Sequence, residues 1–198
     1  MKIYDISQEL FTCAVYPGDS QPKRDVLETI EGGSICNLTA FSMCAHNGTH
    51  VDAPYHFYKD GKTIDQVDLS KFVGKCFVCH DSGDITEEKA LRILEKAAKA
   101  DTEATKRILV GGDVTVTPEA AKVFAKSGIV LYGNESQTVG PFDAPAQVHY
   151  EMLGAEIVLL EGIRLDKVED GIYLLDAAPL NLGGSDGAPC RAILIQNP

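Results

Sequence analysis

Cys44-Ala-His46-Asn-Gly-Thr-His50-Val-Asp52-Ala-Pro-Tyr-His56-Phe-Tyr58 is the most informative stretch of this sequence. It contains three of the chain's five histidines, with an aspartate among them. Imidazole nitrogens and carboxylate oxygens together suit zinc, manganese or iron(II). We therefore expect this segment to contribute to a metal site. The alternative is a histidine-rich loop with no ligand role.

The local geometry of this stretch follows from its residue types. A helix is disfavoured by Gly48 and by the β-branched residues around it. A straight strand, at about 3.3 Å per residue, would separate His46 from His50 by roughly 13 Å. We predict a turn at the Asn-Gly pair that ends at Gly48, because this dipeptide tolerates positive φ. The chain then continues extended, which places His50 and Asp52 on one face.

Length and composition limit the class of protein. The 198 residues predict one domain, 1–198, with a full core, and 44% hydrophobic and 24% charged residues are ordinary for a globular protein. The net charge of −11 argues against binding to nucleic acid or anionic membranes. An apolar signal segment and a membrane span are both absent from the sequence pattern, so we expect a cytoplasmic protein. The six cysteines are then expected to be thiols.

Strand and helix patterns alternate along the chain. The helix expected at 86–100 is the clearest, with Thr86 as its N-cap. Its apolar face would comprise Ala90, Leu91, Ile93, Leu94 and Ala97. Strands interleaved with helices predict a mixed α/β fold with parallel and antiparallel strands. We expect further helices at 117–128 and 145–152, and strands at 3–6, 34–45, 72–79, 107–112, 129–133, 157–161, 172–177 and 191–195.

Two later residues are candidates to complete the metal site. His149 lies on the expected helix 145–152, and Glu161 ends the apolar strand that follows it. A helix–strand reversal brings these two positions close together. A carboxylate at the tip of a buried strand needs a partner, and a metal ion is a suitable one. Either residue could instead be structural.

The combined motifs resemble the cyclase family that contains bacterial kynurenine formamidase and isatin hydrolase. The resemblance rests on the histidine motif and covers nearly the whole chain. It extends to Tyr16-Pro-Gly-Asp19, to His149 with Glu161, and to the closing motif Gly184-Ser-Asp-Gly-Ala-Pro-Cys-Arg191. Membership implies a mixed-sheet swivelling β/β/α domain that forms a homodimer or homotetramer.

The resemblance also implies roles for individual residues. It implies a site with one or two divalent metal ions, zinc first and manganese as the alternative. One metal would be bound by His46, His50 and Asp52, and a second by Asp52, His149 and Glu161. His56 would be the general acid/base, because a histidine tuned near neutrality can accept and return a proton. Tyr16 would contact the substrate.

The implied activity is hydrolysis of a non-peptide carbon–nitrogen bond in a small-molecule amide. Aryl formamidase, which converts N-formylkynurenine to kynurenine and formate in tryptophan catabolism, is the leading activity. The first alternative is hydrolysis of a cyclic amide or lactone, as in isatin hydrolase. The second is a metal or thiol sensor without catalysis.

Several positions depart from the family pattern. The chain has no Trp, and Tyr16 stands where formamidases commonly have one. Cys44 and Cys190 replace a Ser and an aliphatic residue. The segment 133–140 also differs, with Glu135, Gln137, Thr138 and Gly140 at the changed places. We expect these changes to face the substrate, which makes hydrolase chemistry a firmer prediction than the particular substrate.

Cys76-Phe-Val-Cys79-His80 is a second motif with possible chemistry. It matches haem-attachment and redox-dithiol patterns. On a strand, however, Cys76 and Cys79 would face opposite sides of the sheet. Buried structural thiols are therefore the preferred interpretation, with a redox pair as the alternative.

Overall fold

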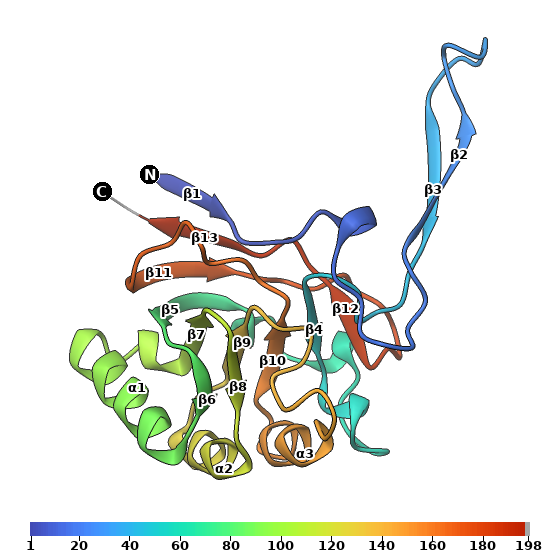
Figure 1. Cartoon of the computed structure of the whole chain (residues 1–198). Coiled ribbons are helices and arrows are strands. Elements are labelled where there is room, and N and C mark those ends of the chain that lie inside the picture. The colour runs from blue at the N-terminus through green and yellow to red at the C-terminus, as the bar shows by residue number, and fades with distance from the viewer. Residues whose placement is uncertain (197–198) are drawn as a thin grey trace.

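The structure, a computed structural model that describes residues 1–196, is organised around a curled nine-stranded mixed sheet (Figure 1). The four central strands β5, β7, β9 and β10 run parallel, and antiparallel strands flank them on both sides. This confirms the predicted mixed α/β fold. In spatial order the strands are β1 (Lys2–Asp5), β13 (Ile193–Gln196), β11 (Gly171–Asp176), β5 (Val73–His80), β7 (Arg107–Gly111), β9 (Leu131–Asn134), β10 (Val158–Glu161), β4 (His50–Asp52) and β12 (Gly187–Pro189).

Helices α1 (Glu87–Ala100), α2 (Pro118–Ser127) and α3 (Ala146–Gly154) lie side by side below the central strands in Figure 1. Each connects one parallel strand to the next, as right-handed crossover units require. The short parallel pair β6 (Gly83–Ile85) and β8 (Val114–Val116) lies beside them. In the described residues, the three α-helices therefore form a layer against the nine-stranded curled sheet.

The hydrophobic core has two parts, one on each face of the sheet. The first lies under the helices and includes Phe124 and Leu159. The second lies inside the curl of the sheet and includes Phe72 and Leu160. Leu159 and Leu160 are neighbours on β10, and they point into different cores because strand side chains alternate. A polar residue on β10 that lies two positions from Leu159 therefore also faces the helices.

Helix α1 largely matches the prediction. The side chain of Thr86 accepts a hydrogen bond from the Lys89 backbone N–H, as an N-cap does. Ala90, Ile93 and Ala97 are buried. The assignment of Leu91 to the buried face was wrong, because that side chain is 55% exposed. Leu91 lies at the edge of the apolar stripe, where the neighbouring elements do not cover it.

The segment 34–45 forms the predicted strand, but in an unexpected setting. β3 (Leu38–Ser42) pairs with β2 (Lys23–Glu28), which the sequence pattern did not predict. The two strands form a separate antiparallel sheet that extends far from the body (Figure 1). We call residues 23–42 the arm.

Among the described residues, the helices are too short or too polar to cross a membrane.

Candidate active site

The histidine motif has the predicted local structure. Gly48 has a φ of 63°, so the turn depends on the left-handed conformation that glycine adopts readily. Strand β4 follows at once, with His50 and Asp52 on the same face and both buried. Pairing with β10 sets Glu161 directly opposite His50 and Leu159 opposite Asp52. All three polar side chains therefore point toward the helical layer.

Helix α3 supplies the next member of the cluster. His149 is buried, and its Nε2 lies 3.3 Å from Glu161 Oε1 and 3.7 Å from Asp52 Oδ2. On the other side, His50 Nε2 lies 3.4 Å from both Glu161 Oε2 and Asp52 Oδ1. The expected convergence of residues on a helix and a strand tip is thus present.

His46 completes this cluster from the loop before the turn. Its Nδ1 lies 2.8 Å from Asp52 Oδ1. The potential ligand atoms of His46, His50 and Asp52 all lie within 4.8 Å of one another, and so do those of Asp52, His149 and Glu161. Asp52 belongs to both groups. The five side chains thus gather around one shared carboxylate.

Backbone carbonyls fix the orientation of two imidazoles. His50 Nδ1 donates to Gly48 O at 3.1 Å, and His149 Nδ1 donates to Pro145 O at 2.9 Å. A carbonyl can only accept, so the proton is assigned to Nδ1 in each ring. Nε2 is then the nitrogen turned toward the carboxylates. This is how proteins commonly orient histidine ligands of metals.

The buried carboxylates strongly alter the protonation of the histidines. Burial lowers the pKa of His50, but Asp52 and Glu161 outweigh burial and raise the pKa to about 9. Burial also lowers the pKa of His46, while Asp52 and Asp186 raise it to about 11. In return, although burial raises the pKa of Asp52, the imidazoles of His46 and His50 hold it well below the usual range. The cluster thus favours bound positive charge.

These residues fit a divalent cation. Asp52 Oδ2 is buried and has no hydrogen-bond partner among the described residues, although a buried carboxylate oxygen ordinarily has one. Glu161 could also bind a cation. Among the described residues its Oε1 accepts one backbone hydrogen bond, from the N–H of Val139 at 2.8 Å, which leaves a lone pair available. Imidazole and carboxylate donors suit zinc, manganese or iron.

His56 lies at the edge of the cluster beside a carboxylate that sequence reasoning missed. Its ring stacks on that of His46, with centroids 4.0 Å apart. Asp186 Oδ2 lies 3.2 Å from His56 Nδ1 and 2.8 Å from His46 Nε2. These contacts, first from His46 and then from His56, lower the pKa of Asp186. Asp186 precedes β12, whose pairing with β4 brings it here.

A cavity of about 390 Å³ opens onto the cluster. Its size is typical of a small-molecule site. Tyr16 lies at this cavity, and its ring stacks on that of Phe142 at a centroid distance of 5.6 Å. The other lining residues are Asp19, Cys44, His46, His50, His56, Phe57, Gln137, Thr138, Pro145, His149, Glu161 and Asp186.

Three of the departures from the family pattern do not line this cavity, contrary to expectation: Glu135, Gly140 and Cys190. The Glu135 carboxylate accepts bonds from the backbone N–H groups of Gly112 and Leu165, so it supports the fold. Cys190 lines a different hollow near the N-terminus. Gln137, Thr138 and Cys44 do line the cavity, as expected.

The second sequence motif has no comparable site. Cys76 belongs to the core inside the curl and Cys79 to the core under the helices, so the thiols lie on opposite faces of β5, as predicted. Burial raises the pKa of each thiol to about 12. Thiols in such surroundings are poor nucleophiles and poor metal ligands. The next residue, His80, pairs with Asp170 near the surface.

Comparison with known proteins identifies the family. Residues 4–141 match the model of the Cyclase family, described as "Putative cyclase". The chain is 32% identical to the kynurenine formamidase of Bacillus cytotoxicus, over 96% of this chain and 95% of that protein. It is 33% identical to the kynurenine formamidase of Bacillus anthracis, over 98% and 97% of the two chains.

Solved structures show the same fold. A structure described as a potential metal-dependent hydrolase with cyclase activity superposes with a TM-score of 0.80 at 27% identity, covering 100% of this chain and 99% of the other. Isatin hydrolase A from Labrenzia aggregata superposes with a TM-score of 0.83 at 21% identity, covering 99% and 94%. The chain therefore belongs to the cyclase family. It is a hydrolase whose site suits a divalent metal ion.

Proposed function

We propose that this hydrolase cleaves the carbon–nitrogen bond of an aryl formamide, with N-formylkynurenine as substrate and kynurenine and formate as products. The curated relatives at 31–33% identity over nearly the full length are kynurenine formamidases. The observation that carries the proposal is the buried Asp52 carboxylate shared by two groups of potential metal ligands.

We assign His46, His50 and Asp52 to one divalent ion. Asp52, His149 and Glu161 would hold a second, with Asp52 between the two. Zinc is the first candidate and manganese the alternative, because both accept imidazole and carboxylate ligands. Such an ion supplies Lewis acidity, which activates water at neutral pH and polarises the substrate carbonyl.

His56 is the proposed general acid/base. Asp186 holds its Nδ1, which leaves Nε2 as the nitrogen that can take up a proton. His56 would accept the proton lost by the attacking water and deliver it to the departing aryl amine as the carbon–nitrogen bond breaks. Asp186 keeps the ring in position for both transfers. Tyr16, whose ring borders the cavity, would pack against the aromatic part of the substrate.

The proposed setting is tryptophan catabolism in the cytoplasm. All six cysteines are free thiols in the structure, which suits a reducing compartment. We also propose that the chain acts as a homodimer or homotetramer. The exposed apolar surface of the arm supports an assembly of this kind.

A substrate panel tests the proposed activity. Protein purified without chelator would be assayed on N-formylkynurenine, isatin and a simple lactone, and its metal content would be measured on the same sample. We expect the highest kcat/KM on N-formylkynurenine. A clear preference for isatin or the lactone would reassign the enzyme to cyclic substrates. Failure to hydrolyse every substrate with metal saturated would favour a sensor.

A further inference from the structure

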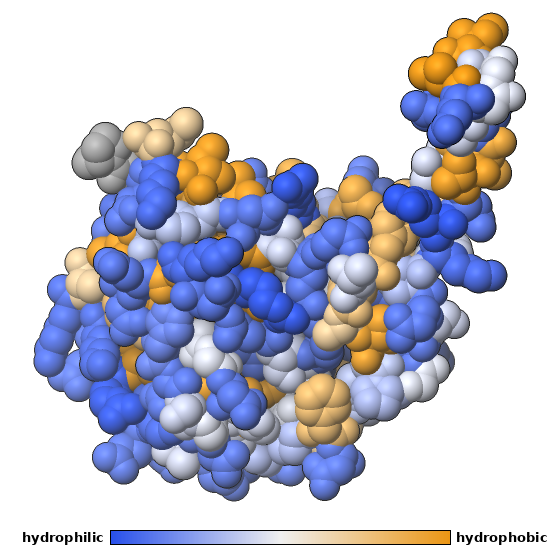
Figure 2. All heavy atoms as spheres, turned by 45° about the horizontal axis from the view of Figure 1, so that its top comes forward, coloured by the Kyte–Doolittle hydropathy of each residue, from blue (hydrophilic) through white to orange (hydrophobic). Residues whose placement is uncertain are grey.

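Buried polar atoms without a hydrogen-bond partner are informative in this structure. Hydrophilic residues cover much of the body in Figure 2, and water can satisfy polar groups there. A buried polar atom lacks that option, so it ordinarily has a partner within the protein. Among the described residues, the side chains with an unpartnered buried atom are Asn47, Asp52, Tyr132, Asn134, Gln137 and Thr138. Of these, Gln137 and Thr138 line the active-site cavity.

The amide group of Gln137 has one fixed orientation. Its nitrogen, Nε2, donates a hydrogen bond to Gly48 O at 3.0 Å. A carbonyl oxygen can only accept, so this contact assigns Nε2 and leaves Oε1 as the unpartnered atom. The amide packs against Gly162, where an added Cβ would overlap Nε2. Gln137 therefore has one free polar atom, a carbonyl oxygen that can only accept a hydrogen bond.

The loop that carries Gln137 is locked onto the strand that carries Glu161. Gly162 N donates to Ser136 O at 2.7 Å, and Val139 N donates to Glu161 Oε1 at 2.8 Å. The backbone on both sides of Gln137 is thus tied to the end of β10, and the side chain is only 7% exposed. A group held this rigidly can select among substrates, because no small movement will find it another partner.

A free acceptor in the cavity wall selects for a hydrogen-bond donor on the substrate. A secondary amide carries an N–H at the bond to be cleaved, whereas an ester or lactone carries an oxygen with lone pairs alone. A site built to bond an N–H rejects the analogue that lacks it, because its own buried group then stays unpaired. The Thr138 hydroxyl can donate or accept, so it does not discriminate between the two.

We propose that Gln137 determines specificity, and that its Oε1 accepts a hydrogen bond from the N–H of the scissile amide. This inference rests on the proposed function, because it concerns the bond that the hydrolase cleaves. Gln137 neither gives nor takes a proton in the reaction. The N–H hydrogen stays on nitrogen, and the second proton of the departing amine comes from His56. Secondary amides are then preferred over esters and lactones.

Two substrates that differ in one group test this proposal. They are N-formylaniline and phenyl formate, in which an oxygen replaces the N–H. The quantity measured is the ratio of kcat/KM on the amide to kcat/KM on the ester, corrected for spontaneous hydrolysis, so that losses common to both substrates cancel. Gln137→Leu removes the acceptor, and we expect the ratio to fall about tenfold, the effect of one hydrogen bond. Gln137→Glu keeps an acceptor oxygen and should retain most of the wild-type ratio.

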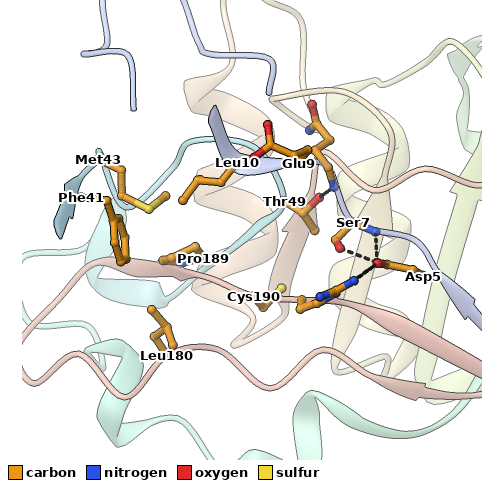
Figure 3. Close-up of a pocket in the computed structure, with 12 residues that line it drawn as sticks. Asp5, Ser7, Glu9, Leu10, Phe41, Met43, Thr49, Leu180, Pro189 and Cys190 are labelled. Carbon is orange, nitrogen blue, oxygen red and sulfur yellow. Dashed lines mark hydrogen bonds and ion pairs between the residues drawn. The ribbon is translucent and has the colours of Figure 1, made fainter. Parts of the chain in front are cut away.

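Gln8→Leu is the matched control. Gln8 also contacts the end of β10, since its Nε2 donates to Gly162 O at 2.8 Å, but its Oε1 is already partnered by Ala14 N. It lines the second hollow and not the active-site cavity. There its backbone N–H donates to Thr49 Oγ1 at 2.9 Å (Figure 3). The control should keep the wild-type ratio even where its stability or metal content falls.

Wild-type protein provides a second measurement that needs no variant. N-methyl-N-formylaniline is an amide without an N–H, so its kcat/KM should be at least about tenfold below that of N-formylaniline. Equal values would overturn the proposal.

The variants separate specificity from a purely structural role. Gly48 O also accepts from His50 Nδ1, so Gln137 could act only by holding this carbonyl. Gln137→Leu would then lose activity equally on amide and ester, with an unchanged ratio, and the proposal would fail while the proposed function stood. A Gln137→Glu ratio as low as that of Gln137→Leu would overturn it too. Metal-saturated wild type that cleaves neither substrate would overturn the proposed function, and this inference with it.

Discussion

Strands β4 and β5 belong to the same sheet, and each carries a motif with potential metal or redox chemistry, yet only one of them forms a site. On β4, His50 and Asp52 are two residues apart, so both face the helical layer and meet Glu161. On β5, Cys76 and Cys79 are three residues apart and enter opposite cores. Spacing along the strand, more than residue type, decides whether reactive side chains converge.

The largest expected effect comes from Asp52→Asn, which removes the charge shared by both ligand groups but keeps the shape. Losing several kcal/mol of electrostatic stabilisation of the transition state should lower kcat/KM by roughly 10³-fold or more. Bound metal should fall in parallel. Elemental analysis and steady-state kinetics measure both, with Asp60→Asn at an exposed position as the control. Normal metal content in Asp52→Asn would contradict the assigned cluster.

His56→Gln should have the next largest effect. Without the proposed acid/base, kcat should fall by roughly 10²- to 10⁴-fold, while metal content stays near the wild-type value. His80→Gln provides the control, because His80 pairs with Asp170 at a distance from the cavity. Equal losses in the two variants would remove His56 from the mechanism.

Asp186→Asn should have an intermediate effect. Asp186 orients both His46 and His56 but is not among the proposed ligands, so a loss of about 10- to 100-fold in activity or metal affinity is expected. Asp186→Glu, which keeps the charge, should recover part of that loss. The idea fails if both variants behave like wild type in metal titration and in kcat.

Removal of the metal should make stability depend on pH. In the metal-free state burial lowers the pKa of His50, but Asp52 and Glu161 raise it from 6.5 to about 9. Because the pKa of His50 is higher in the folded than in the unfolded state, its protonation stabilises the fold fully below about pH 6.5. This stabilisation is lost as the pH rises through about 9. The Tm of chelated protein should therefore fall over this range, and added zinc should reduce the fall because the cation replaces the proton. Differential scanning fluorimetry would show it; a Tm that rises with pH would contradict the account.

Cys76→Ala should have the smallest effect. The thiol is buried on a face of β5 away from the cluster, so kcat/KM should stay within about twofold and stability should fall by about 1 kcal/mol. Mild oxidant should leave the activity of wild type and variant equal. Oxidant sensitivity that disappears in Cys76→Ala would revive the thiol-sensor interpretation.

The local part of the site was predictable because it follows from short-range rules. The Asn-Gly pair, with positive φ at Gly48, and the alternation of His50 and Asp52 on β4 needed only turn and strand geometry. The approach of His149 to Glu161 followed from one helix–strand reversal. These positions lie close along the chain or on consecutive elements.

Other features depend on long-range pairing that the residue pattern does not reveal. Asp186 looks like an ordinary loop aspartate, and only the pairing of β12 with β4 brings it to the histidines. The partner of β3 was missed because β2 is charged and has no buried face. Glu135 was expected to face the substrate because it departs from the family pattern. Its carboxylate instead accepts a hydrogen bond from the backbone N–H of Gly112.

A crystal structure of zinc-loaded protein with anomalous scattering data tests the central claim most directly. We predict an anomalous peak bounded by His46, His50 and Asp52, with ligand distances of about 2.0–2.2 Å. A second peak would lie on the side of Asp52 that faces His149 and Glu161. A zinc-loaded crystal without a peak at Asp52, or with its peak beside Cys76 and Cys79, would contradict the account.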